Sequence, residues 1–246
     1  RANVHCCVSK MTAQQNRTAA PVTIEGRQLS LSNLDKVLYP ESGFTKRQVI
    51  EYYTAIAPYL LPHLKHRPIT MKRFPDGVAG EYFYEKDAPS FTPRWMETFA
   101  IPRSSVGAVV NYTLINDLPS LIWSANLANL ELHPFLAKAP HIERPTMVVF
   151  DLDPGEGMNM LRAGEVAFLL KELLERLNLK SFVKVSGSKG LHLHVPLNTN
   201  VTYEATQPFA NSVAQLLASE HPSLVVSEMA KAKRSWGAVP MKRSMS

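Results

Sequence analysis

The sequence predicts an α+β fold in which short strands and amphipathic helices follow one another along a soluble chain. Short apolar or alternating runs indicate strands, and apolar residues repeating every three or four positions indicate helices. The 246 residues are 45% hydrophobic and 20% charged, which is typical of a globular protein with a sizeable core. No apolar run reaches the roughly 18 residues of a membrane span, so no membrane association is expected.

The charge and cysteine content favour a cytoplasmic protein with a weak preference for polyanions. The formal net charge is +6, a mild indication of a nucleic-acid partner. The two cysteines, Cys6 and Cys7, are adjacent and cannot crosslink a fold, so a reducing compartment is expected. Residues 1–21 are polar, aperiodic and without the apolar core of a signal peptide, which predicts a disordered N-terminal extension.

The first elements have recognisable boundaries. Residues 22–33 mix β-branched and polar side chains and predict one or two short strands. Thr45 and Gln48 have the spacing of a capping box, so a helix is expected to begin there. Pro58 and Pro62 indicate its end.

The remaining elements alternate between the two periodicities, without internal repeats or a clear domain boundary. The expected strands and helices, in chain order, are strands at 68–74, 81–86 and 109–115, a helix from about Leu118 to His133 capped by Asn116 or Asp117, a buried strand at 147–153, a helix at 163–177, a strand, Gly-rich turn and strand over 182–197, and a helix near 204–219.

Two aspartates end the buried strand MVVFDLD. Asp151 and Asp153 are two positions apart, so both side chains of a strand would point to one face and repel one another. A divalent cation removes this repulsion, and oxygen ligands suit Mg²⁺ or Mn²⁺. The alternative is a strand end with two solvated acids. The pattern therefore indicates a candidate metal site at the edge of a sheet.

The turn SGSKG precedes the strand LHLH and is suited to an anion. Gly187 and Gly190 free the backbone to present N–H groups, and Ser186, Ser188 and Lys189 add donors and one positive charge. The spacing does not match a P-loop. The alternative is an ordinary hairpin turn followed by two surface histidines.

Several cations in the first half are interleaved with aromatic residues. This combination suits nucleic acid, although solvated lysines and core aromatics explain the same residues. His133 alone is most simply a structural histidine. The cations and aromatics concerned are Lys36, Lys46, Lys72, Arg73, Lys86, Phe74, Tyr82, Phe83 and Tyr84.

The segment VVFDLDPGEG resembles the first motif of haloacid-dehalogenase-type phosphatases. That resemblance implies Asp151 as nucleophile and Asp153 as general acid. Pro154 and Gly155 depart from the motif, and no aspartate follows Asp153 to complete such a site.

A second resemblance covers most of the chain. It is carried by six blocks in order, which are LSNLDKVLYPESGFTK (31–46), RPITMKRFPDGV (67–78), YFYEK (82–86), LANLELH (127–133), FDLDPG (150–155) and VSGSKGLHLHVPL (185–197), with KAKR (231–234) as a weaker seventh. Together they resemble the polymerase domain of bacterial ATP-dependent DNA ligase D, in the archaeo-eukaryotic primase superfamily. The resemblance implies a primase-polymerase fold of mixed and antiparallel sheets flanked by helices over residues 22–234. It also implies template-directed nucleotidyl transfer at gaps and double-strand break ends in non-homologous end joining.

The resemblance also implies a role for each matching residue. The catalytic metal ligands would be Asp151 and Asp153, and the nucleotide would be bound by Lys72, His133, Ser186, Lys189, His192 and Arg234. The 5′-phosphate of DNA would be bound by Asn33, Lys36 and Lys46. The residues that stack near the template base would be Phe83 and Tyr84. The implied partners are Mn²⁺ or Mg²⁺, gapped or broken DNA with a 5′-phosphate, nucleoside or deoxynucleoside triphosphates, and a Ku-type end binder with ligase or nuclease domains. A nucleoid-associated cytoplasmic location follows from these partners.

The C-terminal end departs from the family pattern. A strand with a third aspartate is expected after KAKR, whereas the chain reads SWGAVPMKRSMS. Residues 235–246 are therefore expected to be an irregular basic tail of truncated or altered origin, leaving a sheet edge unpaired and one of two metal ions weakly bound. The alternative function is a DNA-end-binding module with weak or no catalysis.

Overall fold

The computed structural model divides the chain into two compact units, Arg1–Pro134 and Phe135–Ser246. None of the helices in the described ranges is both long and apolar enough to cross a membrane. The structure describes residues 19–102, 107–155, 159–187, 190–226 and 239–243. The expected N-terminal extension lies mostly outside these residues, but Ala20 and Pro21 already belong to a strand paired with Ser30 and Leu31.

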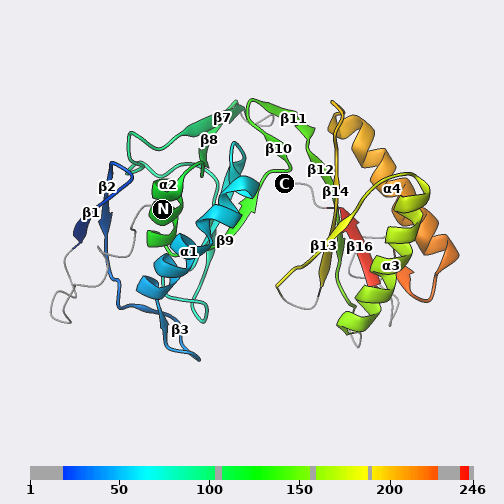
Figure 1. The fold of residues 1–246 in the computed structure, drawn as a ribbon, viewed down its shortest axis with the longest axis horizontal. Coiled ribbons are helices and arrows are strands. Elements are labelled where there is room, and N and C mark those ends of the chain that lie inside the picture. The colour runs from blue at the N-terminus through cyan, green and yellow to red at the C-terminus, as the bar shows by residue number, and fades with distance from the viewer. Residues whose placement is uncertain (1–18, 103–106, 156–158, 188–189, 227–238, 244–246) are drawn as a thin grey trace. The chain divides into compact units, whose positions relative to one another are not determined.

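Unit 1 combines hairpins with two helices (Figure 1). Its elements are β1 (Ala20–Ile24), β2 (Arg27–Leu31), β3 (Val37–Tyr39), β4 (Phe44–Thr45), α1 (Lys46–Leu64), β5 (Pro68–Arg73), β6 (Phe83–Glu85), β7 (Thr98–Pro102), β8 (Val109–Leu114), α2 (Leu118–Asn126) and β9 (Asn129–Pro134). The strand β5 is central, because it pairs antiparallel with β6, β8 and β9. The helices α1 and α2 pack with this sheet around one apolar core.

The start of α1 confirms the predicted capping box. The Thr45 hydroxyl accepts a bond from the Gln48 N–H, and the Gln48 side chain accepts one from the Thr45 N–H. The predicted end is wrong, because the helix continues through Pro58 and Pro62 to Leu64. Each proline removes one backbone donor, but the buried apolar face of the helix extends past both of them.

The predicted helix from Leu118 to His133 is correct only in its first half. Asp117 caps α2 as expected, and the helix ends at Asn126. Ala128 has a positive φ of 55°, which turns the chain into β9. His133 therefore lies on a strand, where it points to the same side as Glu131.

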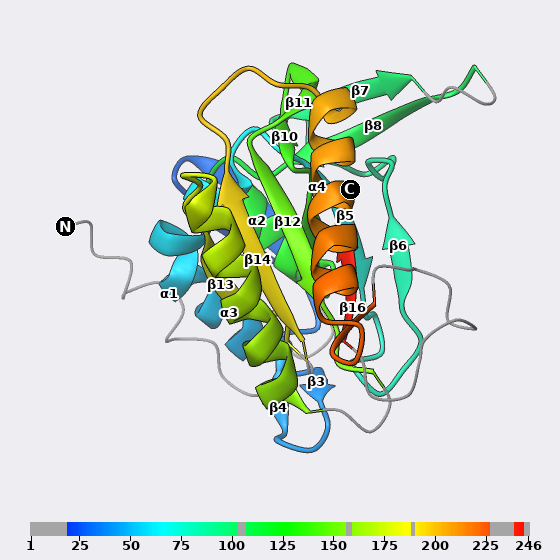
Figure 2. The same ribbon diagram turned by 90° about the vertical axis from the view of Figure 1, so that its right-hand side faces the viewer.

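Unit 2 contains a five-stranded sheet with two helices. Its elements are β10 (Ala137–Lys138), β11 (His141–Pro145), β12 (Met147–Leu152), α3 (Met160–Arg176), β13 (Phe182–Val185), β14 (Leu191–Pro196), α4 (Tyr203–Glu220), β15 (Val225–Val226) and β16 (Val239–Arg243). The strand order is β13-β14-β12-β16-β15. Figure 2 shows α3 and α4 along one face of this sheet, where they enclose the apolar core of the unit.

The two faces of β12 have opposite characters. Val148, Phe150 and Leu152 are buried among the helices. Asp151 alternates with them and points to the face away from the helices, as does its cross-strand neighbour His192 on β14. Asp151 is therefore on the opposite side of the sheet from the helices, on the same side as Val149, which is buried.

The expectation of an irregular tail with an unpaired sheet edge does not hold for Val239–Arg243. These residues form β16, which pairs antiparallel with β12 and parallel with β15. The backbone groups along the free edge of β12 provide the partners that such a segment needs. In this register Lys242 lies across from Asp151, and none of the residues of β16 is an aspartate.

Candidate functional site

The carboxylate of Asp151 lies at the end of β12 beside His192. Its Oδ1 atom is buried and has no hydrogen-bond donor among the described residues. The Nε2 atom of His192 is 3.4 Å from this oxygen. A buried carboxylate oxygen without a donor is costly unless a cation neutralises it. This oxygen is therefore suited to a positive ligand.

The turn before β14 packs directly against the second aspartate. The Ser186 N–H donates to the Gly190 carbonyl at 3.0 Å and closes the turn. A Cβ atom added at Gly190 would lie 2.8 Å from the Leu152 carbonyl oxygen, 2.9 Å from Asp153 Oδ1 and 3.1 Å from Ser186 Oγ. Gly190 therefore allows Asp153 and Ser186 to approach one another. Ser188 and Lys189, predicted in this turn, lie outside the described residues, as does Arg234.

Replacing Gly190 by alanine should displace the Asp153 carboxylate without unfolding the chain. We expect the metal-dependent nucleotide binding that the resemblance implies to weaken at least about tenfold, with a stability loss of roughly 1–3 kcal/mol from the forced contacts. Isothermal titration with ATP and Mn²⁺, and thermal melting, would measure the two effects.

Gly164→Ala is the matched control, because Gly164 lies in α3 with nothing within 4 Å of an added Cβ. It should leave nucleotide affinity unchanged and raise stability by up to about 1 kcal/mol. Wild-type affinity in Gly190→Ala would show that the close approach has no role in binding.

In unit 1, Lys72 is held at the centre of a row of side chains. On β5 it pairs in register with Tyr84 of β6 and with Glu131 of β9, so the three side chains share one face. Its ammonium lies 2.7 Å from Glu131 Oε1, 4.3 Å from the centre of the Tyr82 ring and 5.1 Å from that of Phe74. The bond to Glu131 raises the pKa of Lys72, so this amine stays charged.

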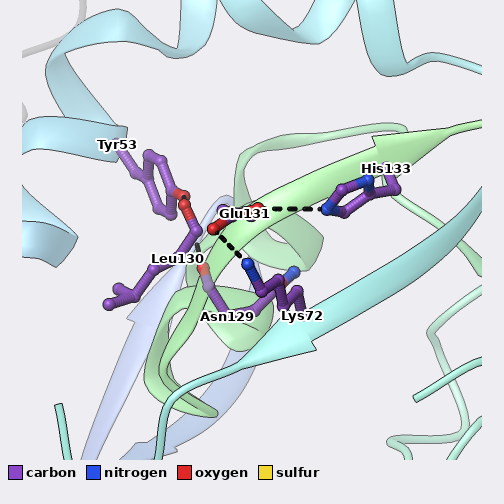
Figure 3. Close-up of polar contacts among 6 residues, drawn as sticks. All are labelled: Tyr53, Lys72, Asn129, Leu130, Glu131 and His133. Carbon is purple, nitrogen blue, oxygen red and sulfur yellow. Dashed lines mark hydrogen bonds and ion pairs between the residues drawn. The ribbon is translucent and has the colours of Figure 1, made fainter. Parts of the chain in front are cut away.

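The strand β9 places Glu131 between Lys72 and His133 (Figure 3). The Oε2 atom of Glu131 is 3.3 Å from His133 Nε2. The Tyr53 hydroxyl of α1 is 3.2 Å from the carbonyl oxygens of both Asn129 and Leu130, which fixes the start of the strand. Burial raises the pKa of Tyr53 and keeps this hydroxyl protonated as a donor. The cluster is thus anchored from the core.

The two aromatic residues predicted to stack near the template lie on different faces of β6. Phe83 packs against the Arg73 guanidinium, 5.1 Å from its ring centre, and Arg73 is paired with Glu85 at 2.8 Å. The Tyr84 ring meets the His133 ring edge to face at 5.7 Å. Because adjacent strand residues alternate in direction, the structure does not bring the two rings onto one surface.

The predicted phosphate-binding residues lie on the segment that leads into α1. Asn33 has a positive φ of 52°, and its carbonyl accepts the Lys36 N–H, while the Lys36 carbonyl accepts the Lys46 N–H. The Lys36 ammonium is 2.7 Å from Asp76 Oδ1. The buried Lys46 ammonium donates to the Ser32 carbonyl at 2.7 Å. This backbone network brings the three predicted residues together.

The environment of Lys46 is unusual for a lysine. Burial, and then the nearby charges of Lys36 and Arg73, lower the pKa of Lys46 to about 8. Burial of a charged amine has a desolvation cost. A bound anion would offset this cost, so the position of Lys46 is suited to an anion. The positive potential at this point comes from three cations on three different segments.

The donors in unit 2 fit a divalent metal only in part. Among the described residues there is no group of three His, Cys, Asp or Glu side chains that could hold an ion. Mg²⁺ commonly uses one or two carboxylates and completes its shell with water and substrate phosphates. The buried oxygen of Asp151 and the neighbouring Asp153 match this minimal arrangement.

Comparison with known proteins identifies the family. A family model of the LigD primase-polymerase domain matches residues 45–239. The chain belongs to the LigD primase-polymerase family. It is 42% identical over 207 residues to the multifunctional non-homologous end joining protein LigD of Mycolicibacterium smegmatis, covering 83% of this chain and 27% of that protein. It is 33% identical over 202 residues to the bifunctional LigD of Bacillus subtilis, covering 81% and 32%.

A solved LigD structure supports the same conclusion for the fold. The polymerase domain of Mycobacterium tuberculosis ligase D, in complex with DNA, matches with a TM-score of 0.80 and 38% identity, over 87% of this chain and 76% of that chain. The predicted α+β class and the predicted family are confirmed. The chain spans 27% and 32% of the length of the two curated relatives, so it corresponds to one part of a LigD protein. The match favours the polymerase interpretation of the D-x-D motif over the phosphatase one.

Two structural features of the candidate site are not predicted from the sequence. The helix predicted to end at His133 gives no reason to single out Glu131, although the alternation of polar and apolar residues in NLELHP indicates the strand that the structure has. Gly190 is predicted to help bind an anion, and in the structure its lack of a Cβ atom also leaves room for the Asp153 carboxylate.

Proposed function

We propose that this chain is a template-directed nucleotidyltransferase that extends DNA at gaps and double-strand break ends in non-homologous end joining. The observation that carries the proposal is the buried Oδ1 atom of Asp151 near the end of β12, which has no hydrogen-bond donor among the described residues, in a chain of the LigD primase-polymerase family. The solved relative in complex with DNA supports DNA as the partner.

The proposed reaction joins a primer 3′-hydroxyl to the α-phosphate of a nucleotide and releases pyrophosphate. A divalent metal on Asp151 and Asp153 would supply positive charge for the triphosphate and the hydroxyl. Ser186 and His192 lie beside the aspartates and are proposed to bind phosphate oxygens. The amine of Lys72 stays charged because its bond to Glu131 raises its pKa, and Lys72 is also proposed to bind phosphate oxygens.

Recognition of a 5′-phosphate is assigned to Asn33, Lys36 and Lys46. The proposal is supported by the shared backbone network of the three residues and by the buried, positively charged position of Lys46. A terminal phosphate carries more charge than an internal one and can approach closely, so it suits such a position better than continuous DNA.

A second candidate, a DNA-end-binding module with weak or no turnover, is favoured by two observations. No third metal-binding carboxylate accompanies Asp151 and Asp153 among the described residues, and β16 places Lys242 across from Asp151. Two carboxylates bind one metal ion more readily than they bind two metal ions. The two candidates share the DNA contacts and differ only in chemistry.

One assay distinguishes the candidates. Gapped DNA with a 5′-phosphate is incubated with the chain, Mn²⁺ and labelled ribonucleotides or deoxynucleotides. Template-directed extension is expected from the first candidate, and a shifted DNA band without extension from the second. Absence of both extension and DNA binding would refute the proposed function.

A further inference from the structure

The carboxylate of Glu131 contacts two groups at once. Its Oε1 atom accepts a bond from Lys72 Nζ at 2.7 Å, and its Oε2 atom is 3.3 Å from His133 Nε2 (Figure 3). The Glu131 side chain is 47% exposed, whereas that of Lys72 is 15% exposed. Glu131 therefore lies between two proposed nucleotide-binding groups and remains open to solvent.

We propose that Glu131 is a positioning residue, which fixes Lys72 and sets the hydrogen-bonding direction of His133 for the incoming nucleotide. The inference rests on the proposed function and deepens it, because it names the residue through which both groups are prepared for binding.

The position of Lys72 follows from its contacts. The ammonium is bonded to Glu131 and lies within 5.9 Å of the ring centres of Phe74, Tyr82 and Tyr84. A free lysine side chain loses substantial rotamer entropy when it binds a ligand. Here the bond to Glu131 has already ordered the side chain. The amine keeps further N–H donors with which to bind a phosphate.

The donor and acceptor atoms of the His133 ring follow from the chemistry of Glu131. A carboxylate only accepts hydrogen bonds, so His133 must carry its proton on Nε2 to bond with Glu131. In the neutral ring Nδ1 is then an acceptor. An acceptor at this atom suits a hydroxyl donor, such as that of a nucleotide sugar.

A purely structural role for Glu131 would have a different signature. Exposed ion pairs contribute little to stability, and the start of β9 is fixed separately by the Tyr53 hydroxyl. Loss of the Glu131 charge should therefore leave the fold intact. A positioning role predicts that nucleotide affinity changes while the melting temperature does not.

The experiment measures the affinity of the full chain for ATP with Mg²⁺ by isothermal titration. We expect Glu131→Gln to weaken binding roughly fivefold, the size expected when one long side chain loses its preorganisation. The control is Glu175→Gln, which removes a Lys–Glu pair of the same 2.7 Å length from the surface of α3. The control should bind as the wild type does.

Double variants test the route of the effect. If Glu131 acts through Lys72 and His133, adding Glu131→Gln to Lys72→Met or to His133→Ala should weaken binding less than it does in the wild type. Unchanged or tighter binding in Glu131→Gln, or an undiminished effect in both double variants, would overturn the inference while leaving the proposed function standing. A wild-type chain that binds no nucleotide would refute the proposed nucleotide site and the inference together.

Discussion

Replacing Asp151 by asparagine is expected to abolish metal-dependent nucleotide binding and to lower any nucleotidyl transfer at least about 1000-fold. The substitution keeps the shape of the side chain and removes its charge. The buried Oδ1 atom has no hydrogen-bond donor among the described residues and lies 3.4 Å from His192 Nε2, so a metal cation is a suitable further partner for it. An amide oxygen is a much weaker ligand for a hard divalent ion.

The effect on stability should have the opposite sign. The Asp151 side chain is 25% exposed, but its buried Oδ1 atom has no hydrogen-bond donor among the described residues. Without metal this charge opposes folding, so asparagine should not lower stability and is expected to raise it by about 1 kcal/mol. For a chain of this size this corresponds to roughly 2–4 °C in melting temperature. A gain in stability with a loss of binding is typical of a residue retained for function.

The measurement compares ATP affinity with Mn²⁺ and with EDTA. Wild-type affinity should fall in EDTA to the level of Asp151→Asn, and the variant should not respond to metal. Glu165→Gln, an exposed carboxylate of α3 paired with Arg162, is the control. Metal-dependent affinity that survives in Asp151→Asn would remove this residue from the site.

The sequence was most informative where local rules coincide with the fold. The capping box at Thr45 and the cap at Asp117 each depend on neighbouring residues, and both predictions are confirmed. The predicted strand before the two aspartates also forms, but it ends at Leu152, so Asp153 lies just beyond it. The helix predicted to reach His133 failed because one residue with a positive φ, Ala128, changes the period from helix to strand. Because a helix is predicted there instead of a strand, the sequence does not place Glu131 beside Lys72 and His133.

Other features depend on partners distant in the sequence and could not be read locally. Val239–Arg243 forms a strand because β12 offers an edge to pair with, and nothing within the segment itself predicts this. The burial of Lys46 is similar, since lysines are almost always exposed. The helix α1 continues past two prolines because its apolar face has a core to cover. Tertiary context decided each case.

Replacing Lys46 by methionine is expected to weaken binding to gapped DNA roughly tenfold when the 5′-phosphate is present, and to have little effect when it is absent. One charge-assisted bond to a phosphate accounts for a change of this size. Lys36→Ala should show the same dependence on the phosphate. Lys65→Met, which removes an exposed lysine at the end of α1, is the matched control.

The pH dependence follows from the lowered pKa of Lys46. Its pKa is about 8 in the folded chain, because burial and the charges of Lys36 and Arg73 oppose the ammonium form, against 10.5 for an ordinary lysine. The preference for phosphorylated over unphosphorylated DNA should therefore decrease as the pH rises from 7 to 9. Lys46→Met should remove this pH dependence. Equal losses on both DNAs, or a preference that does not change with pH, would contradict the phosphate assignment.

The same shift makes Lys46 a destabilising residue at neutral pH. Because the folded pKa lies below the unfolded one, the charged amine opposes folding fully below pH 8, and this cost disappears as the pH rises toward 10.5. A shift of this size is worth about 3 kcal/mol, and the lost bond to the Ser32 carbonyl offsets roughly 1 kcal/mol. Lys46→Met should thus raise the free energy of unfolding by roughly 2 kcal/mol at pH 6. Denaturant titration at pH 6 and pH 10 should show that this gain in the free energy of unfolding is smaller at pH 10. A lower free energy of unfolding for Lys46→Met than for the wild type at pH 6 would show that burial of the ammonium does not oppose folding.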